Sequence, residues 1–151
     1  NDLANAKIED VENIIKSIGL YKMKAKHIIN LSQILVSKHN GEVPGNREDL
    51  EALPGVGRKT ANVVLSNAFN IPAFAVDTHI KRISKRLGIA DDKDDPYKVE
   101  MKLNELFPKE TWHKLHHQLI FFGRYHCTAK KPNCHTCKMK DLCQYFKLGI
   151  D

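Results

Sequence analysis

The amino-acid sequence predicts an all-α protein. Apolar residues recur three or four positions apart along most of the chain, which is the period of an α-helix. Residues typical of helix ends, asparagine or aspartate at the start and glycine after the end, separate these segments. Strand-like alternation of apolar and polar residues does not recur. We therefore expect a series of helices and no sheet.

The first third of the chain contains three of the expected helices. Two apolar stripes, over residues 8–18 and 25–36, are each followed by a glycine that favours a helix end. Asn46 is a suitable N-cap for a third, shorter helix that reaches Leu53, because its side chain can accept a hydrogen bond from the first turn.

Four further helices are expected after that point. One resumes after a glycine-containing turn, two begin at polar residues that can cap a helix, one of them followed by proline, and the last opens at a threonine. The expected starts are Ala61, Asp77 or Thr78, Asp95-Pro96 and Thr111. The segment from Cys127 onward is short and polar, so it needs a metal or a cross-link to hold a structure.

The composition limits the class of protein. The 151 residues are 42% hydrophobic, which is enough for one good core or two small lobes. A net charge of +6 suits a polyanionic partner such as nucleic acid, and a merely basic soluble protein is an equally good interpretation. No run approaches the roughly 18 apolar residues of a membrane span, and no leader-like segment opens the chain. We expect a soluble, intracellular protein with no membrane partner.

The segment Leu53–Ala61 joins two expected helices through a turn with two glycines spaced by one residue. Such a turn leaves amide groups aimed outward, and together with the positive end of the next helix they favour a phosphate group. An ordinary helical corner without a ligand is the alternative, but two cations follow the turn directly. The residues expected to contact the DNA backbone here are Gly55, Val56, Gly57, Arg58 and Thr60.

Four cysteines are confined to the last 25 residues. They are Cys127, Cys134, Cys137 and Cys143, in the spacing C-x6-C-x2-C-x5-C. Structural zinc sites usually have two tight cysteine pairs, whereas this pattern has only one, so an iron–sulfur cluster is favoured. Zinc is the second interpretation, and two local disulfides are the third.

The loop between the first two cysteines is basic. Lys130 and Lys131 lie within it and Arg124 lies just before it, and a metal would hold both of its ends. A loop held in this way loses less entropy when it binds, so we expect these three residues to contact phosphate. The alternative is a charged surface that only keeps the segment in solution.

Three motifs in the same order resemble those of endonuclease III, a family of helix-hairpin-helix DNA glycosylases. They are residues 53–61, the sequence Val76-Asp77-Thr78-His79, and the four-cysteine segment. Gly19-Leu20-Tyr21 with Lys24-Ala25, and Phe122-Gly123-Arg124-Tyr125, also resemble the bacterial members. The resemblance covers essentially the whole chain.

The resemblance implies a helix-hairpin-helix glycosylase fold with two lobes. Residues 1–107 would form a helical barrel lobe, with the hairpin at about residues 46–70, and residues 108–151 would form the cluster lobe. The implied activity is excision of oxidised or damaged pyrimidines followed by β-elimination at the abasic sugar. The implied partner is double-stranded DNA with a damaged base or an abasic site, bound by a monomeric full-length protein in the bacterial cytoplasm, at the nucleoid.

The resemblance also implies the roles of individual residues. Lys59 would be the nucleophile, Asp77 its catalytic partner, and the four cysteines the ligands of a [4Fe–4S] cluster. The residues are suited to these roles: the start of a helix and the neighbouring Arg58 both disfavour the ammonium form of Lys59. Asp77 could stabilise positive charge on the sugar, although aspartate at a helix start is usually only a cap.

Two other functions and one departure from the family are also considered. Mismatch adenine glycosylases share the hairpin and the cluster, but they typically lack a lysine at the position of Lys59 and carry an extra C-terminal domain. A non-enzymatic DNA-binding module would use the hairpin and the basic loop alone. Endonuclease III normally has a substantial segment before the part that matches Ile8, so we expect this chain alone to bind DNA weakly and to retain lyase activity better than glycosylase activity.

Overall fold

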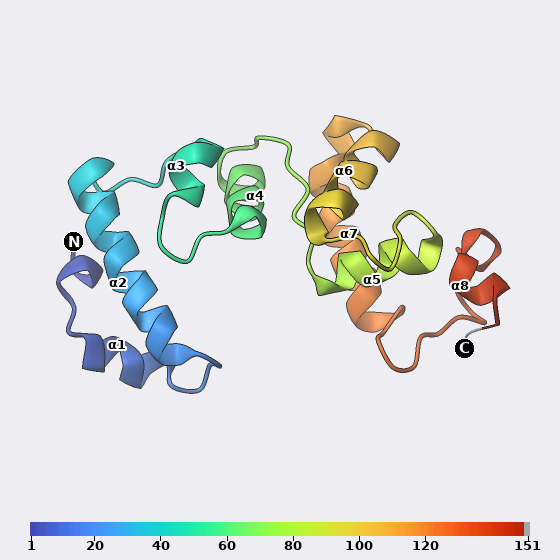
Figure 1. Ribbon diagram of the computed structural model, residues 1–151, viewed down its shortest axis with the longest axis horizontal. Helices are drawn as coiled ribbons and strands as arrows, with labels where there is room; N and C mark the ends of the chain where they lie inside the picture. The colour runs from blue at the N-terminus through green and yellow to red at the C-terminus, as the bar shows by residue number, and fades with distance from the viewer. Residues whose placement is uncertain (150–151) are drawn as a thin grey trace. The chain divides into compact units, whose positions relative to one another are not determined.

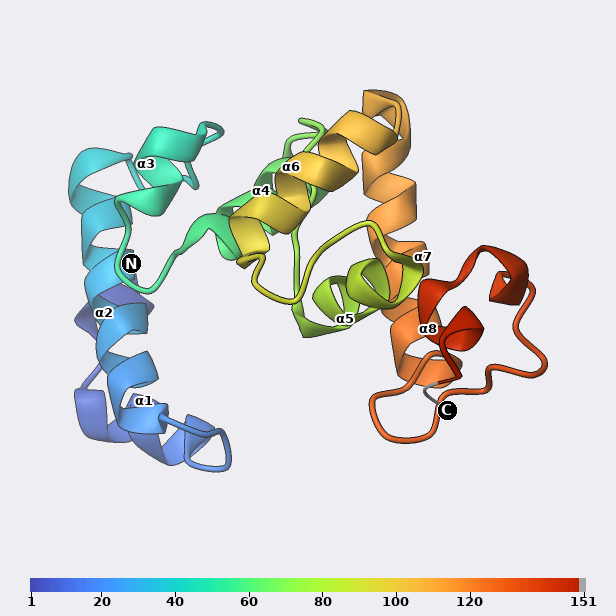
Figure 2. The same cartoon turned by 45° about the vertical axis from the view of Figure 1, so that its right-hand side comes forward.

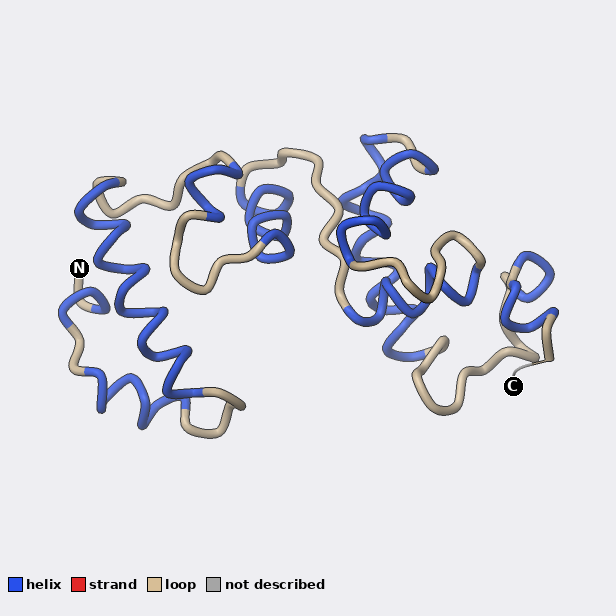
Figure 3. Tube along the Cα trace, viewed as in Figure 1, coloured by secondary structure: helices blue, strands red, loops and turns tan. Residues whose placement is uncertain are grey.

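The computed structural model describes residues 1–149 and is helical within that range (Figures 1 and 3). Among the described residues there is no strand, so the prediction of an all-α protein is confirmed. The α-helices are α1 (Ile8–Ile15), α2 (Tyr21–Lys38), α3 (Arg47–Glu51), α4 (Arg58–Ala68), α5 (Thr78–Leu87), α6 (Pro96–Leu106), α7 (Trp112–Tyr125) and α8 (Gln144–Lys147). Short 3-10 helices span Leu3–Asn5, Lys109–Thr111 and Lys140–Leu142.

Three of the predicted helix starts are set by side-chain caps, whereas the hydroxyl of Thr111 donates to the carbonyl of Pro108 and does not cap α7. The side chains of Asn46, Asp77 and Asp95 each accept a hydrogen bond from a backbone amide three residues later, at 2.8–2.9 Å. Asp77, rather than Thr78, is therefore the N-cap of α5. The helix after the glycine turn begins at Arg58, three residues before the predicted start at Ala61.

The chain divides into two compact units, residues 1–61 and the residues from Asn62 onward. In the first unit α1 packs along α2, as Figures 1 and 2 show. Val11 from α1 is buried against Ala25 and Ile29 of α2. Burying an aliphatic side chain of this size stabilises a fold by about 1.5–3 kcal/mol, so these contacts hold the helix pair together.

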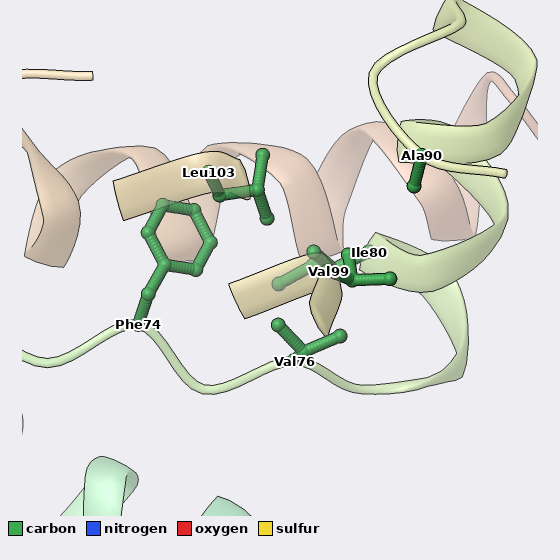
Figure 4. Close-up of a cluster of buried hydrophobic side chains, with 6 residues drawn as sticks. All are labelled: Phe74, Val76, Ile80, Ala90, Val99 and Leu103. Atoms are coloured by element: carbon green, nitrogen blue, oxygen red, sulfur yellow. The ribbon is translucent and has the colours of Figure 1, made fainter. Parts of the chain in front are cut away.

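The second unit has a larger core formed by the segment before α5 and by helices α5, α6 and α7. Its buried residues are Phe74, Val76, Ile80, Ala90, Val99 and Leu103 (Figure 4). Phe74 and Val76 lie on the segment leading into α5 and point toward the side chains of α6. The buried Asn62 side chain donates a hydrogen bond to the carbonyl of Phe74 at 2.8 Å. This core therefore fixes the segment that ends at Asp77.

The predicted lobes, residues 1–107 and 108–151, stay a prediction. Leu103 from α6 and Trp112 from α7 belong to the same core, so this core contains side chains from both sides of position 107. No helix among the described residues combines the length and the apolar character that a membrane crossing requires.

Candidate functional site

The glycine turn before α4 has a left-handed residue at Gly55, and His27 leaves no space for a side chain there. Gly55 has φ +78°, in the left-handed region that favours glycine. A Cβ added there would lie 2.8 Å from Nδ1 of His27 and 3.1 Å from its Cβ. At Gly57 an added Cβ would meet no atom within 4 Å, and its φ is not positive. Only the first of the two glycines is therefore required by the fold.

Helix α4 begins immediately after this turn. The amide of Ala61 donates to the carbonyl of Gly57 at 3.0 Å, so the first turn of the helix is formed. The amides that precede Ala61 in this turn, including those of Lys59 and Thr60, have no acceptor within the helix. Both side chains are exposed, while Arg58 and Val56 are half-buried. The turn therefore presents amide groups and an exposed amine at the start of one helix.

Asp77 is half-buried at the N-terminus of α5. Its Oδ1 accepts a hydrogen bond from the amide of Ile80 at 2.8 Å, which fixes the carboxylate at the helix start. Lys59 belongs to the first unit and Asp77 to the second, and each is positioned by its own unit. The capping role of Asp77 is confirmed, and its catalytic role stays a prediction.

Arg82, one turn after the start of α5, connects three parts of the second unit. Its guanidinium donates to the carbonyls of Gly123 at 2.7 Å and of Cys127 at 2.9 Å, and it lies 3.2 Å from Nδ1 of His79. The two helices approach so closely that a Cβ at Gly123 would lie 2.8 Å from Cβ of His79. Arg82 thus ties the helix capped by Asp77 to the end of α7 and to the first cysteine.

Arg86, one turn further along α5, contacts the first cysteine directly. Its Nη1 donates to Sγ of Cys127 at 3.2 Å and to the carbonyl of Thr128 at 2.7 Å. Its Nη2 donates to the carbonyl of Ala129 at 3.0 Å. The guanidinium carbon also lies 4.5 Å from the ring centroid of Tyr145. Sequence reasoning missed both arginines, because their partners lie more than 40 residues further along the chain.

The four predicted cysteines line one pocket, together with apolar side chains that include Ile83, Leu87 and Phe122. All four are half-buried, and none of them is joined to another described cysteine by a disulfide. The pocket has about 390 Å³ of empty space, part of it open to solvent. Among residues 1–149 no three histidine, cysteine, aspartate or glutamate side chains converge as the ligands of one metal ion would. Four sulfur donors from one short segment, with a single tight cysteine pair, line this pocket, and this donor set fits an iron–sulfur cluster.

The basic loop after Cys127 is held at several points. The hydroxyl of Thr128 donates to the carbonyl of Lys131 at 2.6 Å, and the amide of Asn133 donates to the carbonyl of His126 at 3.0 Å. Lys130 and Lys131 are exposed, as is Arg124 near the end of α7. The three predicted phosphate contacts are therefore accessible and lie in the same unit as the cysteines.

Comparisons with known proteins agree with this geometry. Residues 1–109 match the model of the HhH-GPD superfamily of base excision DNA repair proteins. Residues 127–143 match the iron–sulfur binding domain of endonuclease III. The second match contains all four cysteines. It therefore covers the segment from Cys127 onward that we predicted to need a metal or a cross-link to hold a structure.

Several curated relatives are named endonuclease III. The protein from Bacillus subtilis is 55% identical over 91% of this chain and 63% of its own length. The Escherichia coli K12 protein is 53% identical over 91% of this chain and 65% of its own length. The Thermotoga maritima protein is 44% identical over 97% of this chain and 68% of its own length. The chain thus spans slightly less than two thirds of the first two relatives.

Solved structures give the same result. A trapped covalent intermediate of endonuclease III with DNA matches with a TM-score of 0.94 and 50% identity, over 99% of this chain and 70% of that chain. A thermostable thymine-DNA glycosylase matches with a TM-score of 0.86 and 27% identity, over 97% of this chain and 69% of that chain. The helix-hairpin-helix glycosylase fold is therefore confirmed, and a [4Fe–4S] cluster is the cofactor of the cysteine segment. From its two family models and its relatives, the chain belongs to the endonuclease III family of the HhH-GPD superfamily.

Proposed function

We propose that this chain acts in base excision repair as a DNA glycosylase with abasic-site lyase activity. Its substrate would be double-stranded DNA with an oxidised or damaged pyrimidine or an abasic site. The observation that carries the proposal is the exposed amine of Lys59 on the first turn of α4, directly after the glycine turn. A solved relative was trapped as a covalent intermediate with DNA, which supports a nucleophile on the protein.

In the proposed reaction, the amine of Lys59 attacks C1′ of the deoxyribose, and the bond from C1′ to the damaged base breaks so that the base leaves with that electron pair. The C1′–O4′ bond then breaks, O4′ takes a proton, and the opened sugar is held as a Schiff base. The Schiff base makes the proton on C2′ acidic, so its removal allows elimination of the 3′ phosphate. Nucleophilic attack and strand cleavage thus both depend on one side chain.

Asp77 would stabilise the positive charge that builds on the sugar as the base leaves. One oxygen of its carboxylate already accepts from the amide of Ile80, and this bond holds the group in one orientation. A carboxylate has further acceptor capacity, so capping and catalysis are compatible. The same group could then move a proton between the sugar and water.

The DNA backbone would be held at two places. The first is the turn and the start of α4, through Gly55, Val56, Gly57, Arg58 and Thr60. The second is the basic surface formed by Arg124, Lys130 and Lys131. Contacts to phosphate fix the register on a duplex without reading its sequence, which suits an enzyme that must act at damage anywhere. A monomer at the bacterial nucleoid is the assembly we propose.

The four cysteines would be the cluster ligands. When bound, the cluster would link four positions of a segment that has no hydrophobic core of its own. We assign every chemical step at the sugar to Lys59 and Asp77. The lysine at position 59 and the relatives named endonuclease III favour this function over mismatch adenine glycosylase.

Borohydride trapping on duplex DNA with one abasic site tests the lyase. We expect the chain to form a covalent adduct, and Lys59→Ala to form none, since the trapped bond is the reduced Schiff base of that amine. Lys109→Ala removes another exposed lysine and should leave the adduct unchanged. An adduct that persists in Lys59→Ala would show that another group is the nucleophile. DNA binding without any adduct from the unchanged chain would favour the non-enzymatic binding module.

A further inference from the structure

The guanidinium of Arg86 donates a hydrogen bond to a cysteine sulfur, Sγ of Cys127. We propose that Arg86 is a positioning residue for the [4Fe–4S] cluster, and that it sets both how tightly the cluster is retained and its reduction potential. The proposal rests on the cofactor of the family and not on the lyase reaction, so it can fail while the proposed function holds.

The geometry requires the planar fork of arginine. One nitrogen, Nη1, donates to Sγ of Cys127 and to the carbonyl of Thr128, and the other, Nη2, donates to the carbonyl of Ala129. These bonds fix the first cysteine and the two residues that follow it as one rigid piece. A lysine ammonium is a single point on a flexible chain, so it cannot reproduce the same three bonds from one fixed plane.

Arg86 also contacts the other end of the cysteine segment. Its guanidinium lies over the ring of Tyr145, two residues after the last cysteine. Its backbone carbonyl lies 3.3 Å from Sγ of Cys143. One residue of α5 therefore touches the segment on both sides of the pocket that the four cysteines line. The bonds from the guanidinium to residues 127–129 and its contact with the Tyr145 ring oppose movement of the two ends of the segment away from the cluster.

The charge of Arg86 acts on the cluster as well. Four thiolates make such a cluster anionic, and its reduced form carries one more negative charge than its oxidised form. A cation that donates a hydrogen bond to a ligand sulfur stabilises the more negative form, and hydrogen bonds to the sulfurs and net charge are known controls of reduction potential. Arg86 should therefore raise the potential of the cluster above the value it would otherwise have.

A purely structural role for Arg86 is the alternative, and the potential separates the two. A residue that only holds the loop would change the stability of the segment without a directed change in potential. Three of the five N–H groups of the guanidinium donate to Cys127, Thr128 and Ala129, so a direct phosphate contact by this side chain is less suitable.

The test compares three variants of the cluster-loaded protein. Arg86→Met removes the charge and the fork but keeps an unbranched apolar stem. Arg86→Lys keeps the charge without the fork. Lys81→Met removes a cation from the same helix that makes none of the contacts described above. For each, cluster loss under an iron chelator is followed by visible absorbance, the potential is measured by direct electrochemistry, and helix content is followed by circular dichroism.

We expect Arg86→Met to lose its cluster about tenfold faster or more, since supporting residues around a metal site typically change affinity by that factor. Its potential should also move in the negative direction. Arg86→Lys should lose the cluster faster than the unchanged protein. Its reduction potential should fall less than that of Arg86→Met, because the positive charge is kept. Lys81→Met and Lys59→Ala should match the unchanged protein in both measurements.

An unchanged potential in Arg86→Met would overturn the proposal in favour of a purely structural role, even if the cluster is lost faster. A rate of cluster loss within twofold of the unchanged protein would contradict the positioning role. Equal shifts in Lys81→Met would also overturn it, because any cation of α5 would then suffice. If Arg86→Met retains no helix content, Arg86→Lys decides: cluster loss at the unchanged rate would contradict the positioning role. A failed trapping assay with normal results here would reject the proposed lyase alone.

Discussion

The glycine turn before α4 and the cysteine segment are both expected to contact the DNA backbone, yet they are held in different ways. The turn is fixed by its own backbone and by the flanking helices, and His27 leaves no space for a side chain at Gly55. In the cysteine segment, no residue from Cys127 to Gly149 is fully buried. That segment is held instead by hydrogen bonds from Arg82 and Arg86 and, we propose, by the cluster. The comparison indicates that one fold can position one proposed DNA contact with a local turn and the other with distant side chains and, as we propose, a metal centre.

Removing the cluster should give the largest difference between the two regions. Structural metal sites contribute folding free energy outright, and a segment without a buried residue has little else to stabilise it. After chelation, amide hydrogen exchange over residues 127–149 should accelerate by about a hundredfold or more, equivalent to about 2.8 kcal/mol. Exchange over residues 53–68 should stay within a few-fold of its initial rate. Equal acceleration in both ranges would mean that they unfold as one unit, and the comparison would then be invalid.

Substituting the two glycines of the turn separates folding from DNA contact. Gly55→Ala places a side chain at φ +78° and against His27, so the free energy of unfolding should fall by about 1–3 kcal/mol. Gly57→Ala meets open space and no strain, so its stability should change by less than about 0.5 kcal/mol. Its added methyl group should still weaken DNA binding, because the turn must approach the phosphate closely.

Chemical denaturation and DNA affinity together check this pair. Gly57→Ala is the control for stability, and Gly55→Ala is the control for binding lost through unfolding. If Gly57→Ala binds DNA as well as the unchanged protein, the turn does not approach the backbone at that position. If Gly55→Ala is as stable as the unchanged protein, neither the backbone strain nor the close approach to His27 lowers the free energy of unfolding.

The same two regions show how far sequence reasoning reaches. The caps Asn46, Asp77 and Asp95 were predictable because each depends on residues within one helical turn. The glycine turn was predictable for the same reason, although the sequence could not distinguish the glycine that the fold requires from the one it does not. The cysteine spacing indicated a cofactor, and the matching iron–sulfur domain agrees with it.

The arginines of α5 were not predictable from the sequence. Arg82 and Arg86 are four residues apart on one helix, and such a pair usually lies on a solvated face. Their acceptors are mostly carbonyl groups of residues 123–129, and a backbone carbonyl gives no signal in the sequence. The close packing at Gly123 was not predictable for the same reason, since it depends on where α7 crosses α5. Local chemistry can thus be predicted, whereas long-range support for a site requires the structure.

The carboxylate of Asp94 lies outside both regions, and its ion pair with Lys102 serves as a reference for an ordinary electrostatic effect on stability. The carboxylate of Asp94 accepts from Nζ of Lys102 at 2.7 Å and from the amide of Asp91 at 2.8 Å. The hydrogen bond from Lys102, followed by that from Asp91, lowers the pKa of Asp94 below its ordinary value of 3.8. A pKa that is lower in the folded than in the unfolded state stabilises the fold above 3.8, and this stabilisation is lost as the pH falls through the folded value.

Asp94→Asn should therefore give the smallest of these effects, and one that depends on pH. The thermal midpoint of the variant should lie below that of the unchanged protein at pH 7, and the two should approach each other as the pH is lowered below 3.8. The effect is small because the partner Lys102 side chain is 37% exposed, so water screens the charge. A gap of equal size at pH 7 and at pH 3 would show that the amide disturbs packing rather than charge. Cluster retention should not change, because this ion pair lies outside the contacts that hold the cysteine segment, whereas Arg86 acts on a ligand sulfur itself.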